Sequence, residues 1–67
     1  MVFNCGDLAF VAVDWRALQD HPALAGKPCL VLKRHKYKTR FVTSFYYDVL
    51  IECKQERLDE AVLVNAL

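Results

Sequence analysis

The sequence predicts an all-β fold in which four to five short antiparallel strands, with one short helical turn, close into a small barrel. Three observations support this prediction. The chain has 67 residues, which is one domain at most, and 55% of them are hydrophobic, enough for a compact core. Its apolar runs are short and strand-like, and no segment has the length of an independent helix. Closure into a barrel removes the exposed strand edges that an open sheet leaves unpaired.

The first part of the chain is predicted to be a short strand followed by a long loop with brief helical turns. Residues 8–13 are apolar on both alternate faces, which fits a strand in a tightly curved sheet. Asp14 is a good helix N-cap, so we expect one helical turn over residues 15–19. Pro22 ends that turn, and a second turn closes at Gly26. We expect this loop to reach the core through three large apolar side chains, Trp15, Leu18 and Leu24.

Two strands follow, and the second has the clearest pattern in the chain. Pro28 suits the first position of a strand, and residues 29–34 form the earlier strand. From Phe45 onward, apolar residues alternate with mostly polar ones, so one face of this strand is assigned to the core. The members of that face are Phe45, Tyr47, Val49, Ile51 and Cys53. The rest of the chain is predicted as a polar turn at 55–57, a strand end with a helical turn at 58–61, and a last short strand at 62–64.

One stretch of this near-neutral chain, residues 33–40, concentrates positive charge. It contains five of the nine Lys and Arg residues and none of the eight acids, while the whole chain has a net charge of +1. We place it at the connection between the second and third strands. In extended geometry alternate side chains share a face, so four of the five cations form one row. That row is Arg34, Lys36, Lys38 and Arg40, with Lys33 and Tyr37 on the other face.

Such a row can follow a phosphate backbone, and this gives the candidate nucleic-acid-binding residues. They are Lys33, Arg34, Lys36, Lys38 and Arg40. The alternative is a solvated hairpin whose charges only keep an exposed strand edge from pairing. Three aromatic residues, Trp15, Tyr37 and Tyr46, are candidates for an interaction surface. Simpler interpretations remain open, with Trp15 as a core anchor and Tyr46 as an ordinary surface residue of a strand.

The residues that usually carry catalysis or bind metals form no recognisable constellation. Cys5, Cys29 and Cys53 are odd in number and form no C-x-x-C pair, so we expect three reduced and mostly buried thiols. His21 and His35 lack the spacing of metal ligands. We therefore expect no enzymatic activity, no cofactor and no metal. No signal-peptide pattern and no apolar run of about 18 residues is visible, so we expect a cytoplasmic protein without a membrane partner.

Four segments carry a resemblance that covers nearly the whole chain: residues 6–11, 24–32, 47–51 and 58–63. Together they resemble small SH3-like barrels of the KOW-like or bacteriophage accessory type. In that family a Gly-Asp opening, a long first loop, a Val-rich strand, a hairpin and a helical turn before the last strand follow in this order. One departure is Cys29, where the family often has a second glycine. The resemblance implies a single SH3-like domain over residues 1–67.

The sequence therefore favours a small non-enzymatic binding or assembly module. The first hypothesis is sequence-tolerant association with nucleic acid, or with an acidic protein surface, through the basic stretch. The alternative is a protein-protein interaction or oligomer-forming module, whose viral or mobile-element origin is implied by the resemblance alone. A third hypothesis is a reduced toxin similar to mRNA interferases, because residues 6–11 and 27–32 resemble the opening of that family. None of that family's catalytic residues can be placed in this chain.

Overall fold

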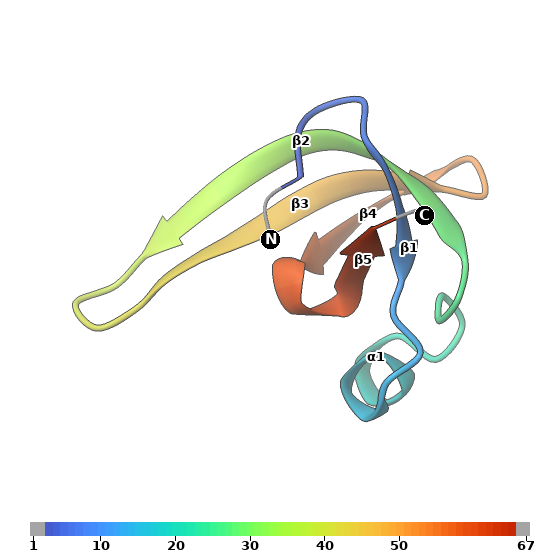
Figure 1. The fold of residues 1–67 in the computed structure, drawn as a ribbon, viewed down its shortest axis with the longest axis horizontal. Helices are drawn as coiled ribbons and strands as arrows, with labels where there is room; N and C mark the ends of the chain where they lie inside the picture. The colour runs from blue at the N-terminus through green and yellow to red at the C-terminus, as the bar shows by residue number, and fades with distance from the viewer. Residues whose placement is uncertain (1–2, 66–67) are drawn as a thin grey trace.

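The computed structural model describes residues 3–65 and is mostly β, with one small helix (Figure 1). Five strands form one antiparallel sheet in the order β4-β3-β2-β1-β5, so β4 and β5 are its edges. The elements are β1 Leu8–Val11, α1 Trp15–Asp20, β2 Pro28–Lys38, β3 Thr43–Ile51, β4 Lys54–Asp59, the 3-10 helix η1 Glu60–Val62, and β5 Leu63–Asn65. The all-β prediction is confirmed. Residues 1–2 and 66–67 of the predicted 1–67 domain lie outside the described residues.

The sheet must be strongly curved, because a very short connection joins its two edges. Strand β4 ends at Asp59 and β5 begins at Leu63, with only η1 between them. Four residues of chain span at most about 14 Å. The outer strands of a flat five-stranded sheet lie about 19 Å apart. Curvature brings the edges together, although the strand pairing is that of an open sheet, and closure into an SH3-like barrel stays a prediction.

Helix α1 begins at the predicted cap, but it buries a different residue from the ones expected. The Asp14 carboxylate accepts a hydrogen bond from the Ala17 N–H at 2.9 Å, and Ala17 is fully buried. Trp15 is 71% exposed and Leu18 is 49% exposed, so the prediction that they anchor the loop in the core is wrong. A helix of six residues presents one narrow face to the core, and Ala17 occupies it. Leu24 does pack partly against the core.

The hairpin between β3 and β4 turns earlier than the sequence suggested. Glu52 and Cys53 have φ angles of 49° and 65°, which are the positive values of a two-residue hairpin turn. Strand β3 therefore stops at Ile51, and residues 55–57 belong to β4. The predicted polar turn at 55–57 is wrong, because two residues with positive φ had already reversed the chain. Cys53 consequently lies in the turn and is exposed, not in the core.

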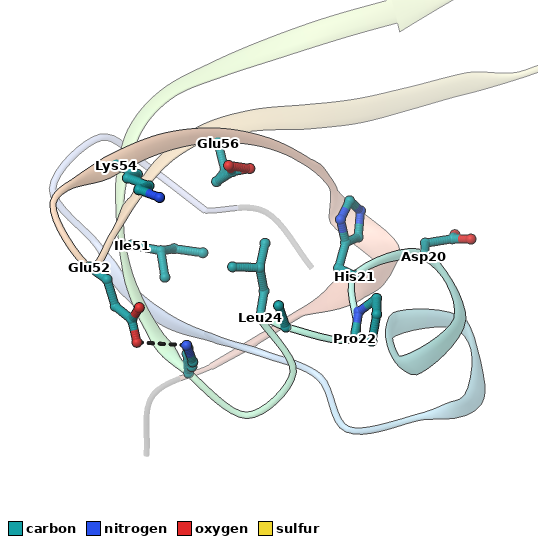
Figure 2. Close-up of a pocket in the computed structure, with 10 residues that line it drawn as sticks. Asp20, His21, Pro22, Leu24, Ile51, Glu52, Lys54 and Glu56 are labelled. Atoms are coloured by element: carbon teal, nitrogen blue, oxygen red, sulfur yellow. Dashed lines mark ion pairs between the residues drawn. The ribbon is translucent and has the colours of Figure 1, made fainter.

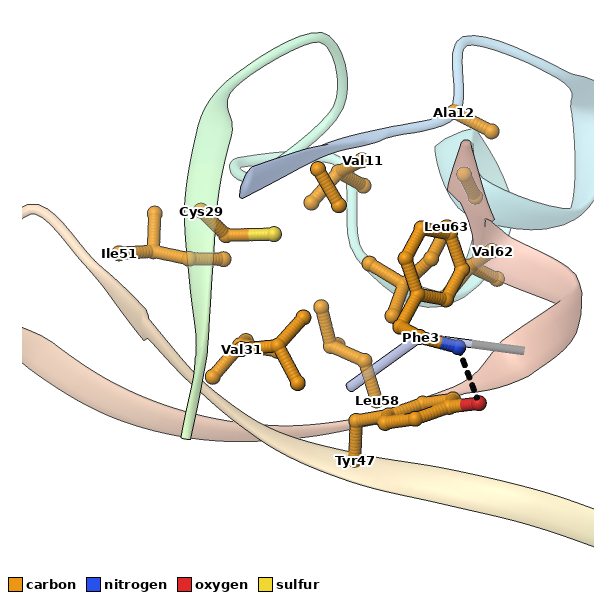
Figure 3. Packing of buried hydrophobic residues seen from close by; sticks show 13 residues of the cluster. Phe3, Val11, Ala12, Cys29, Val31, Tyr47, Ile51, Leu58, Val62 and Leu63 are labelled. Atoms are coloured by element: carbon orange, nitrogen blue, oxygen red, sulfur yellow. Dashed lines mark hydrogen bonds between the residues drawn. The ribbon is translucent and has the colours of Figure 1, made fainter. Parts of the chain in front are cut away.

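The core lies inside the curve of the sheet and is built as the β3 alternation predicts (Figure 3). Tyr47, Val49 and Ile51 are buried, and Phe45 packs partly against them. The Tyr47 hydroxyl oxygen accepts a hydrogen bond from the buried Phe3 N–H at 3.1 Å. The fully buried large side chains are Phe3, Val11, Val31, Tyr47, Val49, Ile51, Leu58 and Val62.

The three cysteines of the chain do not behave alike. Cys29 is buried in the core, and burial raises the pKa of its thiol. Cys5 and Cys53 are exposed, so the prediction of mostly buried thiols is wrong for two of the three. Both of the exposed thiols lie in turns, Cys5 before β1 and Cys53 between β3 and β4. Within residues 3–65, no helix is long and apolar enough to cross a membrane.

Candidate nucleic-acid interface

The most distinctive feature of the molecule is the far half of the β2–β3 hairpin, residues 33–45, here called the arm. Strand β1 pairs with β2 only over residues 28–30, and β4 pairs with β3 only from residue 46 onward. Along the arm, β2 therefore pairs only with β3: residues 36–38 pair with 43–45, and residues 33–35 pair with 46–48. Figure 1 shows this two-stranded ribbon extending past the other strands, with the hairpin turn at its far end. The basic stretch is thus mostly strand, and β2 is longer than the predicted 29–34.

A β-bulge sets which side chains share a face of the arm. The β2–β3 register slips between Val31 and Lys33, which adds one residue, Leu32, to β2. Val31 faces the core before the bulge. Beyond it, Arg34 and Lys36 lie opposite Tyr47 and Phe45, and so share the core face of the sheet.

The two faces of the arm now have a defined composition. The core face carries Arg34, Lys36 and Lys38, and the opposite face carries Lys33, His35 and Tyr37. Three of the four cations expected in one row therefore share a strand face. Arg40 is the fourth, and it lies in the turn beyond the end of β2. Because the arm extends past the core, the cations on each of its faces are exposed, and so is Arg40 in the turn.

The positive charge of the arm is not neutralised within the described part of the chain. Among residues 3–65, the ion pairs are Lys27–Glu52, His35–Asp48 and Arg57–Asp48, and none includes an arm Lys or Arg. The Arg34 guanidinium lies 5.4 Å from the centre of the Phe45 ring, a cation–π contact that leaves its charge in place. The arm holds five cations and no acid, while the other residues of the chain sum to a charge of −4. The molecule is thus strongly dipolar.

A polar cluster on the outer face of the sheet fixes the root of the arm. Asp48, only 8% exposed, accepts a hydrogen bond from Arg57 Nε at 3.0 Å. Its other oxygen lies 2.8 Å from His35 Nε2. The His35 hydrogen bond, followed by that of Arg57, holds the pKa of Asp48 below its ordinary value, and Asp48 raises that of Arg57. The cluster joins β2, β3 and β4 where the arm leaves the body.

Tyr46 belongs to this cluster and is not a free surface ring. Its ring stacks on His35 with centroids 4.8 Å apart and an angle of 10°, and the Arg57 guanidinium lies 5.2 Å from its centre. These partners come from the strands on both sides of β3. Tyr37, by contrast, is 55% exposed on the arm. Trp15 lies on α1, away from the hairpin turn (Figure 1), with the Arg16 guanidinium 5.6 Å from its ring.

Sequence reasoning missed two parts of this surface. The His35–Asp48–Arg57 cluster depends on long-range register, although an acid inside the apolar strand 45–51 was a signal for it. The second is Phe41, which is 88% exposed in the turn of the arm. An aromatic residue directly after Arg40, outside any alternating pattern, was the available signal.

An open hollow of about 410 Å³ lies near the β3–β4 turn (Figure 2). Apolar groups such as Leu24 and Ile51 line it together with three acids, Asp20, Glu52 and Glu56. Lys27 pairs with Glu52 across its rim at 2.7 Å. Within residues 3–65, no three His, Cys, Asp or Glu side chains gather closely enough to hold a metal ion.

Comparisons of the chain with family models, with curated proteins and with solved structures find no match. What the protein binds must therefore be inferred from its own side chains and their arrangement.

Proposed function

We propose that this chain is a non-enzymatic nucleic-acid-binding module that contacts phosphates with the arm. The observation that carries the proposal is the concentration of five cations, none in an ion pair with residues 3–65, on a ribbon that extends from the body. Lys and Arg side chains that replace the counterions of a phosphate backbone supply most of the affinity in sequence-tolerant binding. The arm carries no recognisable base-reading motif, so binding is expected to tolerate many sequences.

The root of the arm supports this role by keeping the nearest carboxylate away from a ligand. Asp48 is almost buried, and both of its oxygens are occupied by His35 and Arg57. A free acid at this position would repel phosphates and weaken the field of the neighbouring Lys33. The same cluster ties β2 and β4 to β3, so the arm leaves the body from a fixed root.

We also propose that the curved sheet is an SH3-like barrel. Strand β5 pairs with β1 at one edge, and η1 connects it directly to β4 at the other. A helical turn before the last short strand is the order that the resemblance implies. The tight connection supports closure, because it holds the two edge strands close together.

A second candidate function is self-assembly, and one observation favours it. The arm holds five cations and no acid, while the rest of the chain has a net charge of −4. The arm of one copy would complement the negatively charged body of another, which is a head-to-tail contact. Light scattering of the purified protein checks this: a monomer at low salt and high concentration would rule it out.

The nucleic-acid proposal is tested by fluorescence anisotropy with labelled, mixed-sequence single-stranded DNA and RNA. If all five cations meet phosphates, log K falls with log salt with a slope of up to about −3.5. Between about 50 mM and about 200 mM salt, affinity then falls by roughly 100-fold. Lys36→Gln should lower the slope by about 0.7, while Lys54→Gln, a cation on β4, should leave it unchanged. No binding at about 50 mM salt would refute the proposal.

A further inference from the structure

We infer that Phe41, at the turn of the arm, is a base-stacking residue and that the ligand is single-stranded nucleic acid. This inference rests on the proposed function, because it takes the arm as the phosphate-binding element. It adds a base contact to the phosphate contacts, and it selects single strands over duplexes.

The turn is built to hold Phe41 outward. The Thr39 N–H donates to the Val42 carbonyl oxygen at 2.7 Å, and the Thr39 hydroxyl donates to the same oxygen at 3.2 Å. That hydroxyl oxygen also accepts hydrogen bonds from the Phe41 N–H at 3.3 Å and the Val42 N–H at 3.0 Å. Thr39 thus bonds the Phe41 and Val42 N–H groups and the Val42 carbonyl oxygen. Phe41 itself is 88% exposed on this hydrogen-bonded turn.

Phe41 is the ring of the arm that is most available to a ligand. Phe45 is already covered by Arg34, and Tyr46 by His35 and Arg57. Phe41 contacts no ring or cation within residues 3–65, and it follows Arg40 directly. Tyr37, also exposed, lies on the same hairpin between Lys36 and Lys38. Open rings on an element that also carries cations are the combination that single-strand binding needs, with charge for the backbone and π-faces for the bases.

A duplex offers an aromatic ring much less stacking surface than a single strand does. Its bases cover one another's faces, and opening a step for a side chain costs a few kcal/mol. In a single strand the faces are already open, and stacking on an aromatic residue tolerates any base.

The experiment compares four proteins, wild type, Phe41→Ala, Phe41→Leu and Val42→Ala, on an oligo(dT) strand and on a duplex of the same length. Val42 is the matched control, because it is an exposed apolar residue of the same turn, at 56% exposure. Phe41→Leu keeps an apolar side chain but removes the π-system. We expect Phe41→Ala and Phe41→Leu to weaken single-strand binding by roughly 5- to 100-fold, with Val42→Ala close to wild type. The salt slope should not change, since no cation is lost.

The outcomes separate this inference from the proposed function. If wild type binds with a steep salt dependence and both Phe41 variants bind equally well, the stacking inference fails and the phosphate-binding arm stands. If Phe41→Leu retains wild-type affinity while Phe41→Ala loses it, the contact is apolar and stacking is wrong. A duplex bound as tightly as the single strand overturns the single-strand assignment. Absence of salt-dependent binding by wild type refutes the proposed function itself.

Discussion

The hydroxyl of Tyr47 joins the N-terminal segment to strand β3, and its removal should cost measurable stability. The Tyr47 oxygen accepts the Phe3 N–H at 3.1 Å, and both residues are buried. Tyr47→Phe keeps the ring and its edge-on contact with the Phe3 ring, whose centre lies 5.6 Å away. It leaves a buried N–H without an acceptor, which costs about 1–3 kcal/mol. A chain of this size has a total stability of about 3–10 kcal/mol, so the loss is a large fraction.

Thermal unfolding followed by circular dichroism measures this loss. Because about 1 kcal/mol shifts the Tm of so small a domain by about 4–8 °C, we expect Tyr47→Phe to unfold roughly 4–24 °C below wild type. Tyr37→Phe is the control, since it makes the same chemical change on an exposed ring of the arm. It should stay within about 0.5 kcal/mol of wild type. Equal Tm values for the two variants would refute the reasoning, because the Phe3 N–H would then not depend on Tyr47.

Two further predictions concern the acid limit of stability and the β3–β4 turn. The pKa of Asp48 is lowered by His35 and then Arg57 from an ordinary value of 3.8, so its contribution to stability is complete above that pH. That contribution should disappear as the pH falls through the lowered pKa. Urea titrations at acid pH measure this loss of stability. Asp48→Asn should not show the loss, whereas Asp20→Asn, a change at an exposed acid, should show it as wild type does. Cys53 has a φ of 65°, which costs an L-residue about 1–2 kcal/mol, so Cys53→Gly should raise the urea midpoint. A lower midpoint would show that the turn is not strained.

The parts of the fold that follow local rules were predictable from the sequence. The alternation from Phe45 onward gave the core face of β3, because a strand with one buried face has a strict period of two. Asp14 gave the start of α1, because its carboxylate meets an amide that the helix leaves unpaired. The exposure of Trp15 was not predictable, since it depends on which face of α1 meets the core and not on the chemistry of the side chain.

Several features of the arm cannot be predicted from local sequence patterns, because they depend on how the strands pair. The row of Arg34, Lys36 and Lys38 follows from the pleat alone. The face that the row occupies depends on the bulge at Leu32, and a bulge is a property of two paired strands. The length of β2 was underestimated because its far half pairs with β3 without burying apolar side chains. The Asp48 cluster likewise needs three strands in register before its members meet.

The central claim is that the cations on one face of the arm bind phosphates, and a comparison of two triple variants tests it most directly. The first changes Arg34, Lys36 and Lys38 to Gln, and the second changes Arg16, Lys27 and Lys54 to Gln. Both remove the same net charge, but only the first removes it from the arm. With single-stranded DNA, the arm variant should reduce the magnitude of the salt slope by about 2, and the control should remain close to wild type. Equal slopes for the two variants would contradict the claim.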